Sequence, residues 1–144
     1  MFIRSLNGYI STGNYFEEND ASYAHNNAWE VWDPGNTFIR NKGNYSSYGF
    51  WLGGSCHAVL IGNEAAYNGV RRDSAPESFG NAGIAVVNGS SSHVVMKHNH
   101  IHYNKSVGVA IRYKEKYKAN HWCYNIIRLL ITKPTVFIYS RLIG

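Results

Sequence analysis

The chain has 144 residues, 44% of them hydrophobic, and a formal net charge of +5. This length suits one domain with a modest core and is short for two. With 14 Gly and 11 Tyr beside only two Met, the composition favours strands and turns and argues against a helical protein. We therefore expect an all-β fold.

Charge is distributed unevenly along the chain. Residues 1–33 carry five acids and one base, whereas residues 97–144 carry nine bases and a single acid, Glu115. A basic end attracts polyanions, such as an acidic polysaccharide, a nucleic acid or a membrane surface. No nucleic-acid recognition motif accompanies it, so we do not predict a nucleic-acid partner.

The two ends of the chain and its two cysteines bear on export, membrane insertion and cross-linking. Residues 1–20 contain no apolar stretch long enough for a secretory signal, and export would need one that this chain does not carry. The apolar tail 126–144 is interrupted by basic residues and by Pro134, which favours a buried or capping segment over a membrane span. Cys56 and Cys123 specify neither a disulfide framework nor a zinc site, and a disulfide between them stays open.

Taken in chain order, four segments repeat one pattern. Each has a large apolar residue, an Asn three positions later and a Tyr four positions after that; the segments are 16–23, 38–45, 60–67 and 96–103. The asparagines, Asn19, Asn41, Asn63 and Asn99, are spaced by 22, 22 and 36 residues. The segment 70–82, rich in charges, Ser, Pro and Gly, reads as an insertion that accounts for the longer interval.

A second set of apolar pairs follows the tyrosines. The pairs are Trp29/Val31, Phe50/Leu52, Ile84/Val86 and Val109/Ile111. Their alternation is the period of strands with one buried face. No single repeat can bury that face alone, and stacking the repeats as coils at the ~4.8 Å strand spacing solves this problem.

In these repeats the chain resembles the right-handed parallel β-helix repeat family, the pectate-lyase-like solenoid superfamily. The resemblance implies a right-handed parallel β-helix of about four to five coils. We expect residues 1–113 to form the coils, with the inserted loop 70–82, and residues 114–144 to form an irregular basic segment and an apolar cap or tail.

The repeat register predicts which residues stack. Phe16, Phe38, Leu60 and Met96 should form one buried column, and Asn19, Asn41, Asn63 and Asn99 an asparagine ladder. We expect the ladder residues to pair with one another at an inward bend, where Asn tolerates left-handed backbone. The next position reads Asp20, Lys42, Glu64 and His100, a column of alternating charge in which His100 lies beside Glu64.

The histidines of the segment 98–104 fit this register better than they fit a metal site. His98 and His102 fall in variable columns that we expect to be exposed, and the bend at Asn99 separates His98 from His100. The register offers no fourth protein ligand, so a solvated face is favoured over zinc. His57 and His93 align and are expected to form a stacked pair.

Proteins that resemble this family often bind or process polysaccharides, and two hypotheses follow. Glycoside hydrolysis needs converging carboxylates, which are scarce here, whereas β-elimination from a uronide needs a base and a cationic group. The candidate catalytic residues are Arg71, Arg72, Asp73 and His100. The candidate substrate-binding residues are Trp51, Trp32, Lys97, His98, His102 and Arg112.

The two tryptophans carry a separate expectation. Strand parity points Trp51 outward, and Trp32 likewise if its strand extends that far. Each then offers an apolar platform for a sugar ring, or packs beneath the loop 70–82.

We favour a polysaccharide-binding or structural β-helix segment of a carbohydrate-active protein. The alternative is a polysaccharide lyase or epimerase that acts on acidic, uronic-acid polysaccharide. The expected partner is an acidic polysaccharide, without a nucleic acid or a membrane span, and the open coil edges favour end-to-end self-association. The expected location is extracellular or in the cell envelope, and a role for Ca²⁺ is left open.

Overall fold

The computed structural model describes residues 1–7, 9–69, 81–88, 93–113, 128–130 and 138–139. The strands are β1 (Phe2–Ile3), β2 (Tyr15–Glu17), β3 (Trp29–Val31), β4 (Thr37–Ile39), β5 (Phe50–Leu52), β6 (Val59–Ile61), β7 (Glu64–Ala66), β8 (Ile84–Asn88), β9 (Val95–Lys97), β10 (His100–His102), β11 (Val109–Tyr113), β12 (Arg128–Leu130) and β13 (Ile138–Tyr139). No described residue is helical. The prediction of an all-β protein is confirmed.

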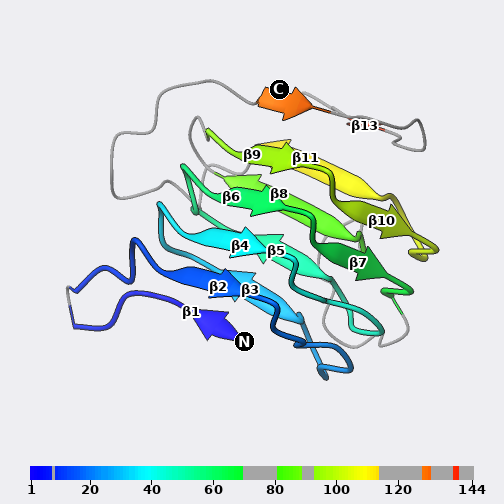
Figure 1. Cartoon of the computed structure of the whole chain (residues 1–144), viewed down its shortest axis with the longest axis horizontal. Helices are drawn as coiled ribbons and strands as arrows, with labels where there is room; N and C mark the ends of the chain where they lie inside the picture. Colours follow the sequence, from blue (N-terminus) through cyan, green and yellow to red (C-terminus); the bar gives the residue numbers. More distant parts are fainter. Residues whose placement is uncertain (8, 70–80, 89–92, 114–127, 131–137, 140–144) are drawn as a thin grey trace.

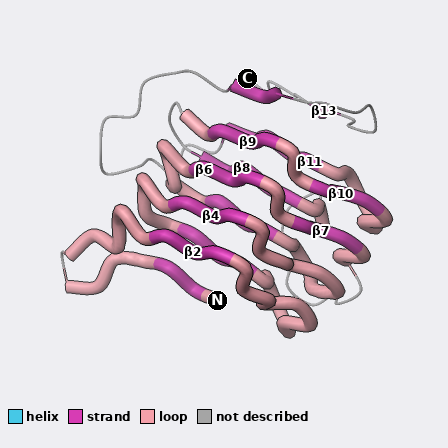
Figure 2. Tube along the Cα trace, in the orientation of Figure 1, coloured by secondary structure: helices cyan, strands magenta, loops and turns pink. Residues whose placement is uncertain are grey.

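The strands form stacked parallel sheets, because each turn of the chain returns to pair with the turn before it (Figure 1). One sheet has the order β1-β3-β5-β8-β11-β13, a second has the order β2-β4-β6-β9-β12, and β7 pairs with β10 in a third. Figure 2 shows how short strands alternate with bends around each coil. The fold is therefore a parallel β-helix.

The predicted register is confirmed at each column. Phe16 lies opposite Phe38, Phe38 opposite Leu60, and Leu60 opposite Met96. In the first sheet, Trp29 is followed by Phe50, Ile84 and Val109, and Val31 by Leu52, Val86 and Ile111. These two sets of side chains meet inside the coils and form one apolar core. Leu60 and Phe38 are fully buried in it.

The asparagine ladder is confirmed as well. The side-chain oxygens of Asn41, Asn63 and Asn99 each accept hydrogen bonds from the backbone and side-chain N–H groups of the ladder residue one coil earlier, at 2.8–3.2 Å. The left-handed residue, however, is the one before each Asn, which corrects our expectation. Glu18, Arg40, Gly62 and His98 have φ values of 56°, 50°, 65° and 55°.

The structure contains a second bend of the same kind, five residues further along each coil. Tyr23, Tyr45, Tyr67 and Tyr103 have φ values of 61°, 51°, 55° and 52°. A ladder again follows the left-handed residue: Ser46 N–H bonds to Asn68 Oδ1, and Asn68 N–H bonds to Asn104 Oδ1, both at 3.0 Å. Each coil therefore carries a short segment between two sharp bends, and β7 and β10 lie in that segment.

The last two strands of the chain extend the two larger sheets. β12 pairs with β9, and β13 pairs with β11, so both sheets continue beyond residue 113. The rest of the segment 114–144 lies outside the described residues, and its expected boundary stays a prediction.

His57 and His93 form the expected ring pair, with centroids 5.6 Å apart. Cys56 is disulfide-bonded, and the only other cysteine, Cys123, lies outside the described residues.

Candidate functional site

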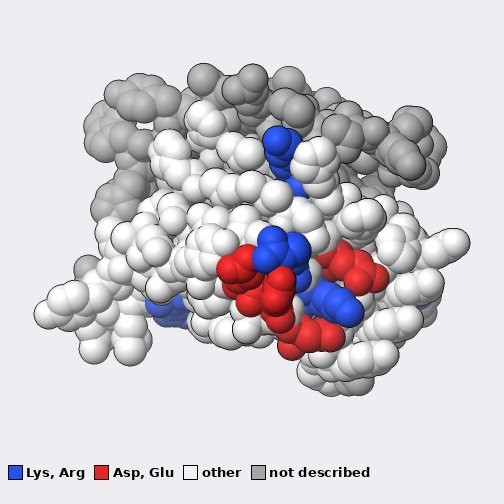
Figure 3. Space-filling model, in the orientation of Figure 1, with Lys and Arg blue, Asp and Glu red and all other residues white. Residues whose placement is uncertain are grey.

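The candidate site lies on the outer surface of the short segment between the two bends. Strand alternation turns every second residue outward there, and the left-handed residue at each bend also projects outward. The four columns of this segment are Glu18/Arg40/Gly62/His98, Asp20/Lys42/Glu64/His100, Ser22/Asn44/Ala66/His102 and Tyr23/Tyr45/Tyr67/Tyr103. In the third column, Asn44 and Ala66 are buried and His102 is exposed. The acidic and basic side chains gather in one patch (Figure 3). We call the second set the charged column and the fourth the tyrosine stack.

A hollow of about 290 Å³ opens in this surface, lined by Arg40, Asn41, Lys42, Gly62, Glu64, His100 and His102. Its cause is Gly62, which has no side chain in a column where the neighbouring coils carry Arg40 and His98. A Cβ placed on Gly62 would lie 3.4 Å from Arg40 Cγ, so any larger residue would begin to fill the hollow.

The basic side chains that line the hollow differ in how firmly they are paired. Arg40 binds Glu18 through Nε at 2.9 Å and also pairs with Glu17. Lys42 and His100 are exposed, and within the described part of the chain neither side chain forms a hydrogen bond or an ion pair. These two side chains are therefore available to a ligand.

The carboxylates of Asp20 and Glu64 each lie close to a partner group. Hydrogen bonds from Ser22 lower the pKa of the Asp20 carboxyl, and the nearby Lys42 ammonium lowers that pKa further. The backbone N–H of Ser22 lies 2.9 Å from Asp20 Oδ1. Glu64 Oε1 lies 3.8 Å from His102 Nε2. The Asp20 carboxylate is therefore a charged acceptor at neutral pH.

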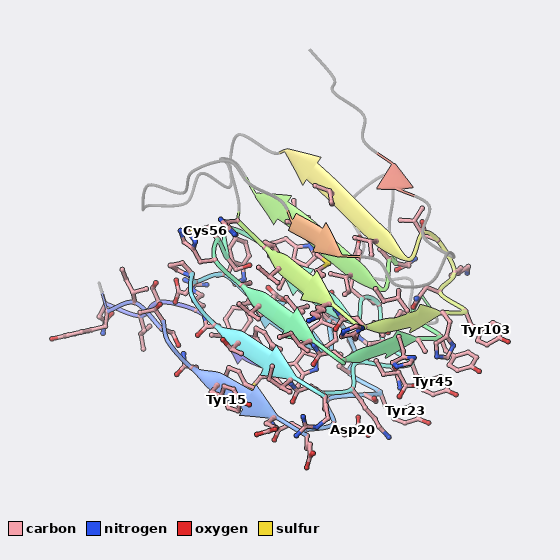
Figure 4. The ribbon with its side chains drawn as sticks, turned by 45° about the horizontal axis from the view of Figure 1, so that its top comes forward. Tyr15, Asp20, Tyr23, Tyr45, Cys56 and Tyr103 are labelled. Atoms are coloured by element: carbon pink, nitrogen blue, oxygen red, sulfur yellow. The ribbon has the colours of Figure 1, made fainter. Side chains whose placement is uncertain are left out.

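Beside the charged column, the four tyrosine rings stack along the coil axis. Successive ring centroids lie 4.8, 4.9 and 5.1 Å apart, and the rings are within 15° of parallel. Tyr23 and Tyr103 are 67% and 75% exposed, and Figure 4 shows the labelled rings projecting from the edge of the coils. The stacked faces cover one another, so the ring edges and hydroxyl groups face the solvent.

The phenol group of Tyr45, in the middle of the stack, stays protonated. Desolvation raises the pKa of Tyr45, and the nearby Tyr23, Tyr67 and Glu64 raise it further. Each coil therefore presents one hydroxyl group that both donates and accepts a hydrogen bond.

His102 connects the hollow to the tyrosine stack. Besides its contact with Glu64, its ring lies edge-on to Tyr67 and Tyr103, with centroid distances of 5.7 and 5.1 Å. Charged groups, imidazoles and phenols thus form one continuous surface.

The family model described as "Right handed beta helix region" matches residues 2–123 of this chain. The chain belongs to this family. No curated protein and no solved structure matches the chain. Within its described residues, this right-handed β-helix has no helix with the length and apolar character needed to cross a membrane.

The right-handed β-helix brings only some of the predicted site residues together. His100 and His102 line the hollow, and His98 and Lys97 are exposed beside it, at the bend and at the end of β9. The catalytic candidates Arg71, Arg72 and Asp73 lie outside the described residues, as does the side chain of Arg112. The predicted binding role of each residue stays a prediction.

The tryptophans lie elsewhere, on the outer face of the sheet that contains β3 and β5. Trp51 faces outward, as strand parity predicts, but it is only 5% exposed and packs in a second apolar cluster with Tyr48, Ala85 and Val87. Trp32 is half-buried against it, with ring centroids 4.8 Å apart. The expectation of an exposed platform at Trp51 is therefore wrong, because neighbouring side chains cover its ring. Ala82, at the end of the expected insertion, belongs to that cluster.

The residues predicted from the sequence do not include Arg40, Lys42 or Glu64, and no role was predicted for the tyrosines. The tyrosines recur four residues after each ladder Asn, and that spacing was a usable signal. The column of His102 is also less uniform than expected, because Asn44 and Ala66 are buried beneath their neighbours.

The described residues offer no candidate site for Ca²⁺. Among the residues that the structure describes, no three His, Cys, Asp or Glu side chains form a group that could hold a metal ion.

Proposed function

We propose that this right-handed β-helix binds a polysaccharide on the surface formed by the hollow and the tyrosine stack. One observation carries the proposal: His102 joins a carboxylate, the basic side chains of Lys42 and His100 and a row of phenols into a single exposed surface. Sugars present hydroxyl groups along both edges and apolar faces between them, so they need this mixture of donors, acceptors and aromatic contact.

The charges of the hollow favour an acidic polysaccharide. Arg40, Lys42, His100 and His102 surround the single carboxylate of Glu64. Because neither Lys42 nor His100 forms an ion pair among the described residues, a carboxylate of the ligand can bind these side chains without first breaking one. The uneven charge of the whole chain points the same way, since residues 97–144 carry nine bases and one acid. A location outside the cell or in its envelope, where such polymers occur, is part of the proposal.

Binding of the purified chain to a panel of acidic and neutral polysaccharides tests this proposal. Replacing Tyr45 with Asn, which tolerates the left-handed backbone, should weaken binding about two- to tenfold, from the ~0.5–1.5 kcal/mol of one aromatic contact. The matched control is Tyr9→Asn, since Tyr9 is 83% exposed and lies outside the stack. Equal affinities of the two variants would contradict the proposed surface, and no binding by the parent chain would contradict the function.

The alternative, a lyase or epimerase, rests on Arg71, Arg72 and Asp73 together with His100. His100 is the one member of that group that the structure describes, and its free imidazole faces the hollow. Absorbance from unsaturated product during incubation with uronic-acid polymers would reveal the lyase. A polymer that binds but stays intact, with unchanged stereochemistry, would contradict both the lyase and the epimerase and would support binding without catalysis.

A further inference from the structure

The charged column orders its groups along the coil axis in a way that selects among acidic polysaccharides. Lys42 pairs in register with Glu64, and Glu64 with His100. Each step is one strand spacing, so the side chains of Lys42 and His100 are about 10 Å apart with a carboxylate midway between them. An acidic ligand that lies along the axis meets the ammonium of Lys42, the repelling carboxylate of Glu64 and the imidazole N–H donor of His100 on successive coils.

The tyrosine stack marks the same axial spacing. It presents one phenol per coil, at centroid distances of 4.8–5.1 Å. A sugar ring in an extended polysaccharide is about as long as one strand spacing, so consecutive rings can lie on consecutive coils. The polymer direction that uses both columns is therefore parallel to the coil axis.

A homopolymer of uronic acid fits this column poorly. With one carboxylate on every ring, the ring over the middle coil would hold its charge against Glu64, which costs free energy because like charges lie opposite one another. Glu64 is half-exposed, and its Oε1 lies 3.8 Å from His102 Nε2.

We infer that the preferred ligand is a polysaccharide in which uronic acid alternates with an uncharged sugar that carries N–H or O–H donors. The acidic rings then lie beside Lys42 and His100, and the uncharged ring donates a hydrogen bond to Glu64. This inference rests on the proposed function and names the class of polymer that the same surface selects.

Titration of the full-length chain with three oligosaccharides of matched length tests this selection. The probes are a hyaluronan fragment, in which uronic acid alternates with an N-acetylated sugar, an oligogalacturonate, and a chitin fragment without carboxylates. We expect the hyaluronan fragment to bind about tenfold more tightly than either of the others, a difference of about 1.4 kcal/mol.

Two substitutions test the cause of the preference. Glu64→Lys makes the column continuously basic from Lys42 to His100, so it should reverse the order and favour oligogalacturonate. Glu64→Gln, which keeps the shape and removes the charge, should make the two acidic probes bind about equally. Arg4→Gln removes an exposed cation outside this surface and should leave the order unchanged. Circular dichroism of each variant would verify that the coils remain folded.

The outcomes separate the two proposals. If the parent chain binds oligogalacturonate as tightly as the hyaluronan fragment or more tightly, or if the Glu64 variants keep the parent order, the alternation inference is wrong and the binding function stands. If none of the polysaccharides binds, the proposed function itself is wrong.

Discussion

Asn63 Oδ1 accepts two hydrogen bonds from Asn41, one from the backbone N–H at 2.8 Å and one from the side-chain amide at 3.2 Å. The side-chain amide of Asn63 donates to the carbonyl oxygen of Phe38, in the same coil as Asn41, at 2.9 Å. One buried side chain thus satisfies backbone groups at a bend where the sheet hydrogen bonds are interrupted.

Asn63→Ala should destabilise the chain by about 2–4 kcal/mol, because it leaves a buried N–H and a buried carbonyl group without partners. Asn19→Ala is the matched control. Asn19 is the first residue of the ladder and is exposed, so its loss should cost less than about 1 kcal/mol. Urea unfolding monitored by circular dichroism measures both values. Similar costs at the two positions would show that water replaces the ladder bonds inside the coils.

Leu60→Ala should cost about 2–5 kcal/mol, because Leu60 is fully buried and its loss opens a cavity between coils. Replacing residues 70–80 with a short glycine linker should cost less. The ends of that segment lie in contact, since a Cβ on Gly69 would come within 2.7 Å of Asn81 Cβ. Thermal unfolding of both variants compares them, and a deletion more damaging than Leu60→Ala would identify the segment as a structural brace.

Two glycines should respond to Ala for different reasons. At Gly49 the added Cβ would lie 2.6 Å from the carbonyl oxygen of Gly83 and 2.7 Å from that of Gly43, so the backbone of adjacent coils must move. We expect a cost of about 3 kcal/mol there. At Gly62 the added atom has room, and the cost of about 1 kcal/mol comes from its left-handed φ of 65°. A larger loss of stability at Gly62 than at Gly49 in urea titrations would contradict this assignment.

Acid should remove a contribution that Asp20 makes to stability. Ser22 holds the folded-state pKa of Asp20 below its usual value, so the contribution is complete above the unfolded pKa of about 3.9 and is lost as pH falls through the lower folded pKa. The stability difference between the parent chain and Asp20→Asn should therefore shrink at pH values below about 4. Unfolding midpoints measured across this range provide the test, and a constant difference would show that the hydrogen bonds to Ser22 do not stabilise the charged form.

The 144-residue chain should associate through the edge formed by β1 and β2. β2 is the last strand of its sheet among the described residues, and it presents unpaired backbone groups beside Tyr15, which is 61% exposed. Tyr15→Lys should reduce light scattering, because a charge on an edge strand opposes pairing. Thr37→Lys, in the same column but inside the sheet, is the control. A monomer that is insensitive to concentration would rule out association through this edge.

The coil architecture was predictable because every coil obeys the same local constraint. A buried bend must satisfy its backbone groups, and Asn can do so only when it recurs at one position in each coil. The 22-residue spacing of Asn19, Asn41 and Asn63 was therefore visible in the sequence, and it placed the column of Phe38 and Leu60 correctly. The alternation of charge from Asp20 to His100 followed from the same register.

Other features depend on the three-dimensional packing of the coils. The sequence by itself determined that Trp51 faces outward, but only the surrounding side chains decided that its ring is covered. It also determined that a Tyr recurs in each repeat, whereas a left-handed backbone at each of those positions turns the rings into an exposed stack. The hollow arises from the same cause, because the missing side chain of Gly62 has an effect only where the coils above and below carry His98 and Arg40. Repetition along the chain is a local property that one sequence displays, and exposure is decided by neighbours from other coils.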